Sequence, residues 1–175
     1  MKKLWLYVPL AVFCLLLGFA AYQLSQPKDD FVRSTMIGQP LPQFTLPAAL
    51  PGSRGVSAAD FADGQPRLLN FWASWCLPCI AEAPQLEALK KEGVSIVGIA
   101  IRDKPEDVAR FLEEHGNPYT AIASDDISAV QLALGSSGLP ETFVIDGDGV
   151  VRYQHIGDIR EEHVPVLLAE LRKAE

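Results

Sequence analysis

The chain has 175 residues, with 15 basic and 22 acidic side chains and a formal net charge of −7 at pH 7. This acidic balance argues against the phosphate backbone of a nucleic acid as the main ligand. Hydrophobic residues make up 49% of the chain, too many for a disordered protein, and three cysteines are too few for a disulfide-rich scaffold. The length suits one domain with a short appendage.

Residues 4–24 form an apolar stretch without a charged side chain. As a helix this stretch would be about 31 Å long, enough to cross a hydrocarbon core of about 30 Å. Lys2 and Lys3 precede it, so the positive-inside rule places the N-terminus in the cytoplasm and the rest of the chain outside. We therefore expect residues 1–24 to be a membrane anchor. A cleaved signal peptide is the alternative, although its apolar core is usually shorter.

Residues 25–37 are polar and predict a linker, so the folded domain is expected at residues 38–175. Apolar runs predict buried strands, and the Asp-Gly-Asp-Gly sequence at residues 146–149 predicts the turn of a hairpin. The alternation of strands and helices indicates an α/β domain whose sheet is covered on both faces. Residues 41–46 are expected to form an edge strand, where prolines are tolerated. The other expected strands are residues 67–73, 94–101, 119–123, 142–145 and 150–153, and the expected helices are residues 76–91, 105–115, 127–134 and 161–173.

Cys76 and Cys79 stand where a buried strand is expected to end and a helix to begin. At positions i and i+3 they lie one helical turn apart, close enough for a disulfide. The unpaired N–H groups at the helix N-terminus favour an anion, which lowers the pKa of a thiol placed there. Because a thiolate is the nucleophile in thiol–disulfide exchange, we expect Cys76 to attack a substrate and Cys79 to resolve the mixed disulfide.

Other uses of the cysteine pair remain open. Half of a zinc site would need further ligands, and His115, His155 and His163 show no paired spacing. A purely structural disulfide would close a very short loop and would remove little chain entropy. Copper binding would want a histidine or methionine nearby. The third cysteine, Cys14, is expected to be an inert thiol inside the apolar stretch.

Residues 71–79, Phe-Trp-Ala-Ser-Trp-Cys-Leu-Pro-Cys, resemble the active-site segment of the thioredoxin superfamily, as do Pro84 and the segment Gly138-Leu139-Pro140-Glu141-Thr142. More narrowly, residues 37–158, which include Gly116-Asn117-Pro118-Tyr119, resemble membrane-anchored thiol:disulfide interchange proteins of cytochrome c maturation (the CcmG/DsbE type). The resemblance implies a thioredoxin-like α/β fold with a central mixed β-sheet and helices on both faces, preceded by one N-terminal transmembrane helix. It also implies a single-pass protein of the bacterial inner membrane whose C-terminal domain faces the periplasm.

The resemblance further implies a reductant. Proteins of this type reduce the haem-attachment-site disulfide of apocytochrome c, or of a cytochrome c maturation protein that handles it, and a membrane electron donor then re-reduces them. No bound cofactor is required, because the dithiol carries the two electrons. A general periplasmic disulfide reductase or oxidant is one alternative, and a non-catalytic module that binds apocytochrome or haem is another.

The roles of several site residues follow from the resemblance. In the family the proline at Pro140 is cis and its loop faces the cysteines, which leaves the backbone of Leu139 free to pair with a substrate strand. Thioredoxin has a buried aspartate where this chain has Asn70, so another acid must manage the proton of Cys79. Glu82 is our first choice for that acid and Glu141 the second. The residues expected to contact the substrate are Trp75, Leu77, Pro78, Leu139 and Glu141.

Overall fold

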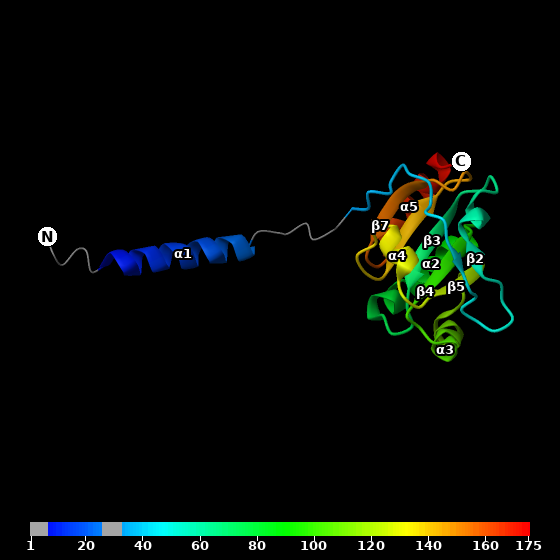
Figure 1. Ribbon diagram of the computed structural model, residues 1–175, viewed down its shortest axis with the longest axis horizontal. Coiled ribbons are helices and arrows are strands. Elements are labelled where there is room, and N and C mark those ends of the chain that lie inside the picture. The colour runs from blue at the N-terminus through cyan, green and yellow to red at the C-terminus, as the bar shows by residue number, and fades with distance from the viewer. Residues whose placement is uncertain (1–6, 26–32) are drawn as a thin grey trace. The chain divides into compact units, whose positions relative to one another are not determined.

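The computed structural model describes residues 7–25 and 33–175 (Figure 1). The chain divides into two compact units, Met1–Phe31 and Val32–Glu175. The first unit contains helix α1, Val8–Ser25, which covers most of the apolar stretch expected to span a membrane. The start of that stretch and residues 26–32 of the expected linker lie outside the described residues. Among residues 7–25 and 33–175, no helix combines the length and the apolar character that crossing a membrane requires.

A five-stranded mixed sheet forms the centre of the second unit, with the strand order β5-β4-β3-β6-β7. The middle strand β3 (Arg67–Trp72) runs parallel to β4 (Ile96–Ile101) and antiparallel to β6 (Glu141–Ile145). At the edges, β5 (Ala121–Asp125) pairs with β4 in parallel, and β7 (Val151–Ile156) pairs with β6 antiparallel. Every residue of β3, β4 and β6 is buried. The predicted α/β class with a central mixed sheet is therefore confirmed.

Helices cover one face of the sheet through a large apolar cluster. They are α2 (Leu77–Lys91), α3 (Pro105–His115) and α5 (Val164–Lys173). The short 3-10 helix η3 (Glu161–His163) precedes α5. Helix α5 starts at Val164 with a proline in its first turn, a place where the missing N–H of proline costs no hydrogen bond.

A second apolar cluster covers the opposite face of the sheet. Helix α4 (Ala129–Ala133) and the 3-10 helix η2 (Ala58–Phe61) contribute to it. A small two-stranded sheet of β1 (Thr45–Leu46) and β2 (Val56–Ser57) lies beside them in the chain. The sheet is thus enclosed between two cores, as the sequence predicts.

The strand expected at residues 41–46 forms only at its end, in β1, and it pairs with β2 rather than with the central sheet. Pro40 and Pro42 have no N–H to donate, so this segment cannot continue a regular ladder. The segment instead makes isolated backbone hydrogen bonds with the turn before β7, such as the bond from the Leu41 N–H to the Gly149 carbonyl at 2.8 Å. The elements β2 and η2 were not expected from the sequence, because both are too short to show a hydrophobic period.

Gly98 lies in β4 where two aromatic side chains pack closely against the strand. The rings of Trp72 and Tyr119 stack with their centroids 5.2 Å apart. A Cβ atom at position 98 would lie 2.8 Å from Trp72 Nε1 and 2.8 Å from Tyr119 Cδ1. Since both aromatic residues are buried, neither ring can move aside without disturbing the core.

We therefore predict that Gly98→Ala lowers the free energy of unfolding by about 1–3 kcal/mol, the usual cost of overpacking a core. Urea denaturation measures the effect. Gly138→Ala is the matched control, because a Cβ atom there would meet nothing within 4 Å. An unfolding midpoint of Gly98→Ala equal to that of the unmodified protein would contradict the packing described for the two rings.

Candidate active site

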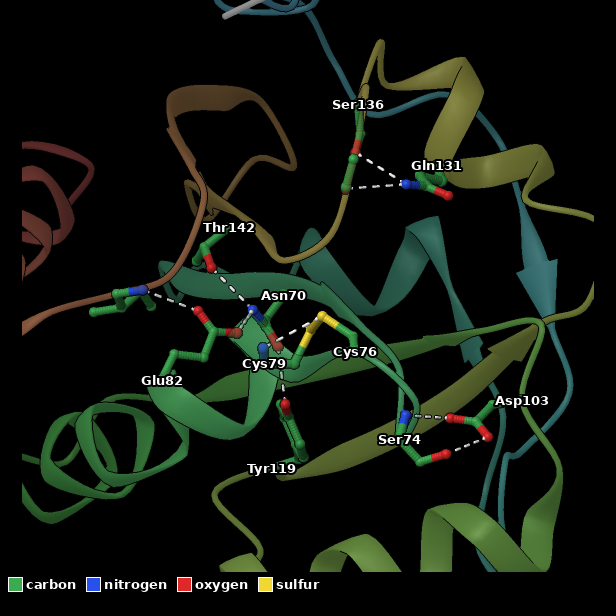
Figure 2. Close-up of a disulfide and its surroundings, with 12 residues drawn as sticks. Asn70, Ser74, Cys76, Cys79, Glu82, Asp103, Tyr119, Gln131, Ser136 and Thr142 are labelled. Atoms are coloured by element: carbon green, nitrogen blue, oxygen red, sulfur yellow. Dashed lines mark hydrogen bonds between the residues drawn. A yellow bond between two sulfur atoms is a disulfide. The ribbon is translucent and has the colours of Figure 1, made fainter.

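A disulfide joins Cys76 and Cys79 at the N-terminus of α2, with their Cα atoms 5.3 Å apart (Figure 2). Cys76 is the N-cap of the helix, and its Sγ accepts a hydrogen bond from the N–H of Cys79 at 3.3 Å. Cys76 borders a surface groove, whereas Cys79 is not among the residues that line it. The first cysteine is therefore the one that a substrate in the groove can approach.

The carboxylate of Asp103, which follows the end of β4, holds the turn between β3 and α2. Asp103 accepts the N–H of Ser74 at 2.5 Å and the hydroxyl of Ser74 at 2.7 Å (Figure 2). The indole N–H of Trp75 donates to the carbonyl of Arg102 at 3.4 Å. The loop after β4 thus fixes the turn that carries Trp75 and Cys76.

The groove beside Cys76 has a volume of about 610 Å³. Trp75 and Leu77 on its rim are 60% and 77% exposed, so apolar surface borders the disulfide. Four of the five residues expected to contact the substrate, namely Trp75, Leu77, Pro78 and Leu139, line this groove. The opposite wall consists of residues 136–139 and part of the α4 region. The peptide bond between Leu139 and Pro140 is cis, as the family resemblance implies.

Glu82 lies one helical turn after Cys79 and has no exposed surface. Its carboxylate accepts the side-chain N–H of Asn70 at 3.1 Å (Figure 2). It also accepts the backbone N–H of Ile159 at 3.1 Å. Burial raises the pKa of Glu82 from an ordinary value of 4.5 to about 8, the negative charge of Asp158 adds to the rise, and the two N–H donors oppose it. At neutral pH the Glu82 side chain therefore holds a proton in this disulfide form.

Asn70 connects Glu82 to two further side chains. Its Oδ1 accepts the hydroxyl of Tyr119 at 2.9 Å, which turns its Nδ2 toward Glu82 and toward Thr142 Oγ1 at 3.0 Å (Figure 2). Burial raises the pKa of Tyr119 well above its ordinary value of 10.0, so the Tyr119 hydroxyl keeps its proton and remains a donor. These contacts hold the Glu82 carboxyl beneath the cysteine pair.

Sequence reasoning did not identify Tyr119 and Thr142 as site residues. It treated Asn70 only as the replacement of an acid and did not anticipate its bonding. Both residues lie in segments that carry the family resemblance, Tyr119 in residues 116–119 and Thr142 in residues 138–142. This resemblance is the sequence signal that points to them. Their bonds to Asn70 join residues 49 and 72 positions apart, which no local pattern reveals.

Glu141 does not line the groove, although the sequence predicted that it contacts the substrate. Its side chain is fully buried at the start of β6. The carboxylate accepts hydrogen bonds from the hydroxyl of Ser136, the N–H of Ser137 and the side-chain amide of Gln154. In this structure Glu141 therefore supports the groove wall from behind and does not face the groove.

The histidines do not gather around the cysteines. His155 and His163 pack ring against ring, with centroids 4.5 Å apart. In the part of the chain that the structure describes, no three side chains of the His, Cys, Asp and Glu types are placed to hold a metal ion.

The Redoxin family model matches residues 36–171 of this chain. The chain belongs to the redoxin family. It is 39% identical to the thiol:disulfide interchange protein DsbE of Vibrio cholerae, over 98% of this chain and 95% of that protein. It is 35% identical to the thiol:disulfide interchange protein HelX of Rhodobacter capsulatus, over 93% of this chain and 92% of that protein.

Solved structures show the same fold. A crystal structure of a thiol:disulfide interchange protein of the thioredoxin family from Chlorobium tepidum matches with a TM-score of 0.62 and 24% identity, over 82% of this chain and 98% of that chain. The resemblance that the sequence suggested, to thioredoxin-like thiol:disulfide interchange proteins, is confirmed by these redoxin relatives. The Cys-x-x-Cys pair on which it was based is at disulfide distance.

The raised pKa of Glu82 predicts that the disulfide form loses stability as the pH rises from about 4.5 to about 8. In this window the folded protein keeps the Glu82 proton, whereas the unfolded chain releases it. The free energy of unfolding should therefore be highest below the unfolded pKa and should fall by up to about 1.4 kcal/mol per pH unit. Urea denaturation at a series of pH values measures the slope.

Glu82→Gln removes the titrating group and should flatten this part of the profile. It should also lower stability at low pH, because an amide at this position sets one N–H against the donor of Asn70 or Ile159. Glu113→Gln, an exposed substitution on α3, is the matched control. If Glu82→Gln and the unmodified protein show the same pH slope, Glu82 is not the group responsible.

Proposed function

We propose that this protein is a periplasmic thiol:disulfide oxidoreductase that acts as a reductant in cytochrome c biogenesis. The observation that carries the proposal is the disulfide of Cys76 and Cys79 at a helix N-terminus, with the first cysteine bordering a groove. The thiol:disulfide interchange relatives support the reaction. The proposed substrate is the haem-attachment-site disulfide of apocytochrome c, or a disulfide of a maturation protein that handles it.

The reaction begins from the dithiol form. The Cys76 thiolate attacks one sulfur of the substrate disulfide, whose S–S bond breaks as a mixed disulfide forms and one substrate thiolate leaves. The Cys79 thiolate then attacks Cys76 Sγ, which breaks the mixed disulfide and releases the second substrate thiolate. The protein ends with the disulfide of the structure. Two electrons have passed to the substrate without a bound cofactor.

The second step requires Cys79 to lose its proton, and we assign Glu82 to receive it. Glu82 stands three residues after Cys79, on the same face of α2. Its pKa of about 8 in the disulfide form gives the ionised carboxylate a strong affinity for a proton, as a general base for a thiol requires. The same pKa means that Glu82 keeps the proton once the disulfide has closed.

Substrate binding is assigned to the groove. Trp75, Leu77 and Pro78 offer apolar contacts next to Cys76, and Leu139 lies across from them. The Leu139 backbone would pair with an extended segment of the substrate, as the family resemblance implies. This pairing would hold the substrate disulfide in front of Cys76 while the exchange takes place.

We also propose that residues 1–24 anchor the protein in the bacterial inner membrane, with residues 25–37 as the linker and residues 38–175 in the periplasm. The uncharged sequence of residues 4–24 supports this, as does α1, whose side chains at positions 7–23 are exposed. An anchor would raise the local concentration of the domain near partners in the same membrane. Those partners include the membrane electron donor that re-reduces the cysteine pair.

We predict that Cys79→Ser captures the substrate as a covalent mixed disulfide, because the resolving thiol is missing while the nucleophile remains. Cells that express the variant are treated with acid to quench thiols, and the captured proteins are identified by mass spectrometry. Cys76→Ser is the matched control, and it should capture none of these partners. Both variants carry Cys14→Ser to remove the third thiol.

Two outcomes would contradict the proposed function. If Cys79→Ser captures no covalent partner while Cys76→Ser still binds its partners non-covalently, the result would favour a binding module. A reduction potential of about −120 mV, the value of a strong periplasmic oxidant, would favour an oxidant instead of a reductant.

For the anchor we expect the full-length chain to fractionate with membranes and to resist extraction at alkaline pH. A variant without residues 1–24, exported by an unrelated cleavable leader, should appear in the soluble periplasmic extract. The intact mass of the purified full-length chain reports whether the N-terminal segment is retained. A full-length protein that has lost this segment would contradict the anchor and would favour the cleaved signal peptide.

A further inference from the structure

The buried carboxylate of Glu141 lies directly behind the wall of the groove. Glu141 follows Pro140 at the start of β6 and has no exposed surface. Its Oε2 accepts the hydroxyl of Ser136 at 2.5 Å and the N–H of Ser137 at 3.1 Å. Both serines line the groove beside Cys76. A carboxylate that accepts such bonds holds its donors more firmly than a neutral acceptor does.

The bonds around Ser136 extend this support along the wall. Ser136 Oγ lies 3.3 Å from the carbonyl of Gly138, but its single proton belongs to the closer, charged acceptor on Glu141. Gln131 Nε2 donates to the Gly138 carbonyl instead, at 3.1 Å, and it also lies 3.4 Å from Ser136 Oγ (Figure 2). Residues 136–138 are thus held from both sides immediately before Leu139.

Gln154 on β7 fixes the other oxygen of the Glu141 carboxylate. Its Oε1 accepts the N–H of Ser34 at 2.7 Å, so its Nε2 must point the other way, where it donates to Glu141 Oε1. Ser34 in turn donates its hydroxyl to the carbonyl of Leu134, just before the groove wall. Glu141 therefore has both oxygens occupied by donors whose orientations are set by their own partners.

We propose that Glu141 is a positioning residue for peptide substrates: it holds residues 136–139 in the shape that receives an extended peptide disulfide beside Cys76. This inference rests on the proposed function and deepens it. A loop that pairs with a substrate strand must keep its backbone groups in register, and an unsupported loop would have to be ordered at each binding event. A small disulfide that reaches Cys76 without filling the groove does not need this support.

The test compares reduction of two disulfides by the dithiol protein. One substrate is a peptide of about ten residues with a Cys-x-x-Cys disulfide, long enough to fill an extended binding groove, and the other is oxidised glutathione. Glu141→Gln turns one amide N–H toward either the Ser137 N–H or the Gln154 amide, so one buried donor loses its acceptor. We expect KM for the peptide to rise about tenfold more than KM for glutathione disulfide, with a smaller change in kcat.

The structure offers a rescue by exchanging the two side chains. In Glu141→Gln with Gln154→Glu, the oxygen of the new amide can accept from Ser136 and Ser137, and its N–H can donate to the new carboxylate. The second oxygen of that carboxylate can accept the Ser34 N–H. The double variant should recover the peptide KM to within about threefold of the original value, whereas Gln154→Glu alone sets two carboxylates against each other and should not.

Glu162→Gln, an exposed substitution in η3, is the matched control and should behave as the unmodified protein. If Glu141→Gln does not fold, as judged by circular dichroism, Ser136→Ala removes a single donor and takes its place in the comparison. Equal losses on both disulfides, no loss on the peptide, or no recovery in the double variant would each overturn the inference. An unmodified protein that reduces neither disulfide would overturn the proposed function and this inference together, whereas one that reduces both leaves the function standing whatever the variants do.

Discussion

The site depends on a fully buried strand that ends at the first turn of a helix. β3 is hydrogen-bonded on one side to β4 and on the other to β6, so its end cannot shift relative to either neighbour. The bonds of Ser74 to Asp103 then hold the turn that follows. As a result Cys76 is placed at the point where the free N–H groups of α2 begin, and its sulfur accepts one of them.

A polar cluster lies beneath this turn, inside an otherwise apolar core. Glu82, Asn70, Tyr119 and Thr142 come from different parts of the chain and have little or no exposed surface. A buried carboxyl group is tolerated there because both of its oxygens have N–H donors. The cost of burial appears as the raised pKa, and that cost gives Glu82 an affinity for a proton in the range where thiols titrate.

The sequence predicts the parts of this structure that local patterns encode. The strands at residues 67–73 and 94–101, the helix after the first cysteine and the hairpin around residues 146–149 follow from apolar runs, spacing and turn residues. The expected edge strand at 41–46 does not join the central sheet, because its prolines lack the N–H donors of a regular ladder. In such segments the available backbone N–H donors, together with the hydrophobic pattern, determine whether a strand pairs.

Local sequence patterns do not predict polar contacts between residues that are far apart in the chain. Glu82 could be proposed as an acid from its distance along the helix, but its partner Ile159 is 77 positions away. Glu141 is predicted to contact the substrate, whereas its bonds to Ser136 and Gln154 turn it inward. In both cases the role of the carboxylate depends on the hydrogen-bond donors around it. Only the folded structure shows which donors lie near it.

The burial of Glu82 also has a consequence for the direction of exchange. In the proposed reaction an ionised Glu82, the minor form at neutral pH with a pKa of about 8, takes up the Cys79 proton as the disulfide closes, and the negative charge departs on the sulfur of the released product. The interior, which is poorly suited to an ion, thereby becomes neutral, while the charge passes to a thiolate that water can solvate. For molecules in which Glu82 is ionised, closure of the disulfide therefore moves a charge from the interior to water, which favours release of the reduced substrate over return to the mixed disulfide.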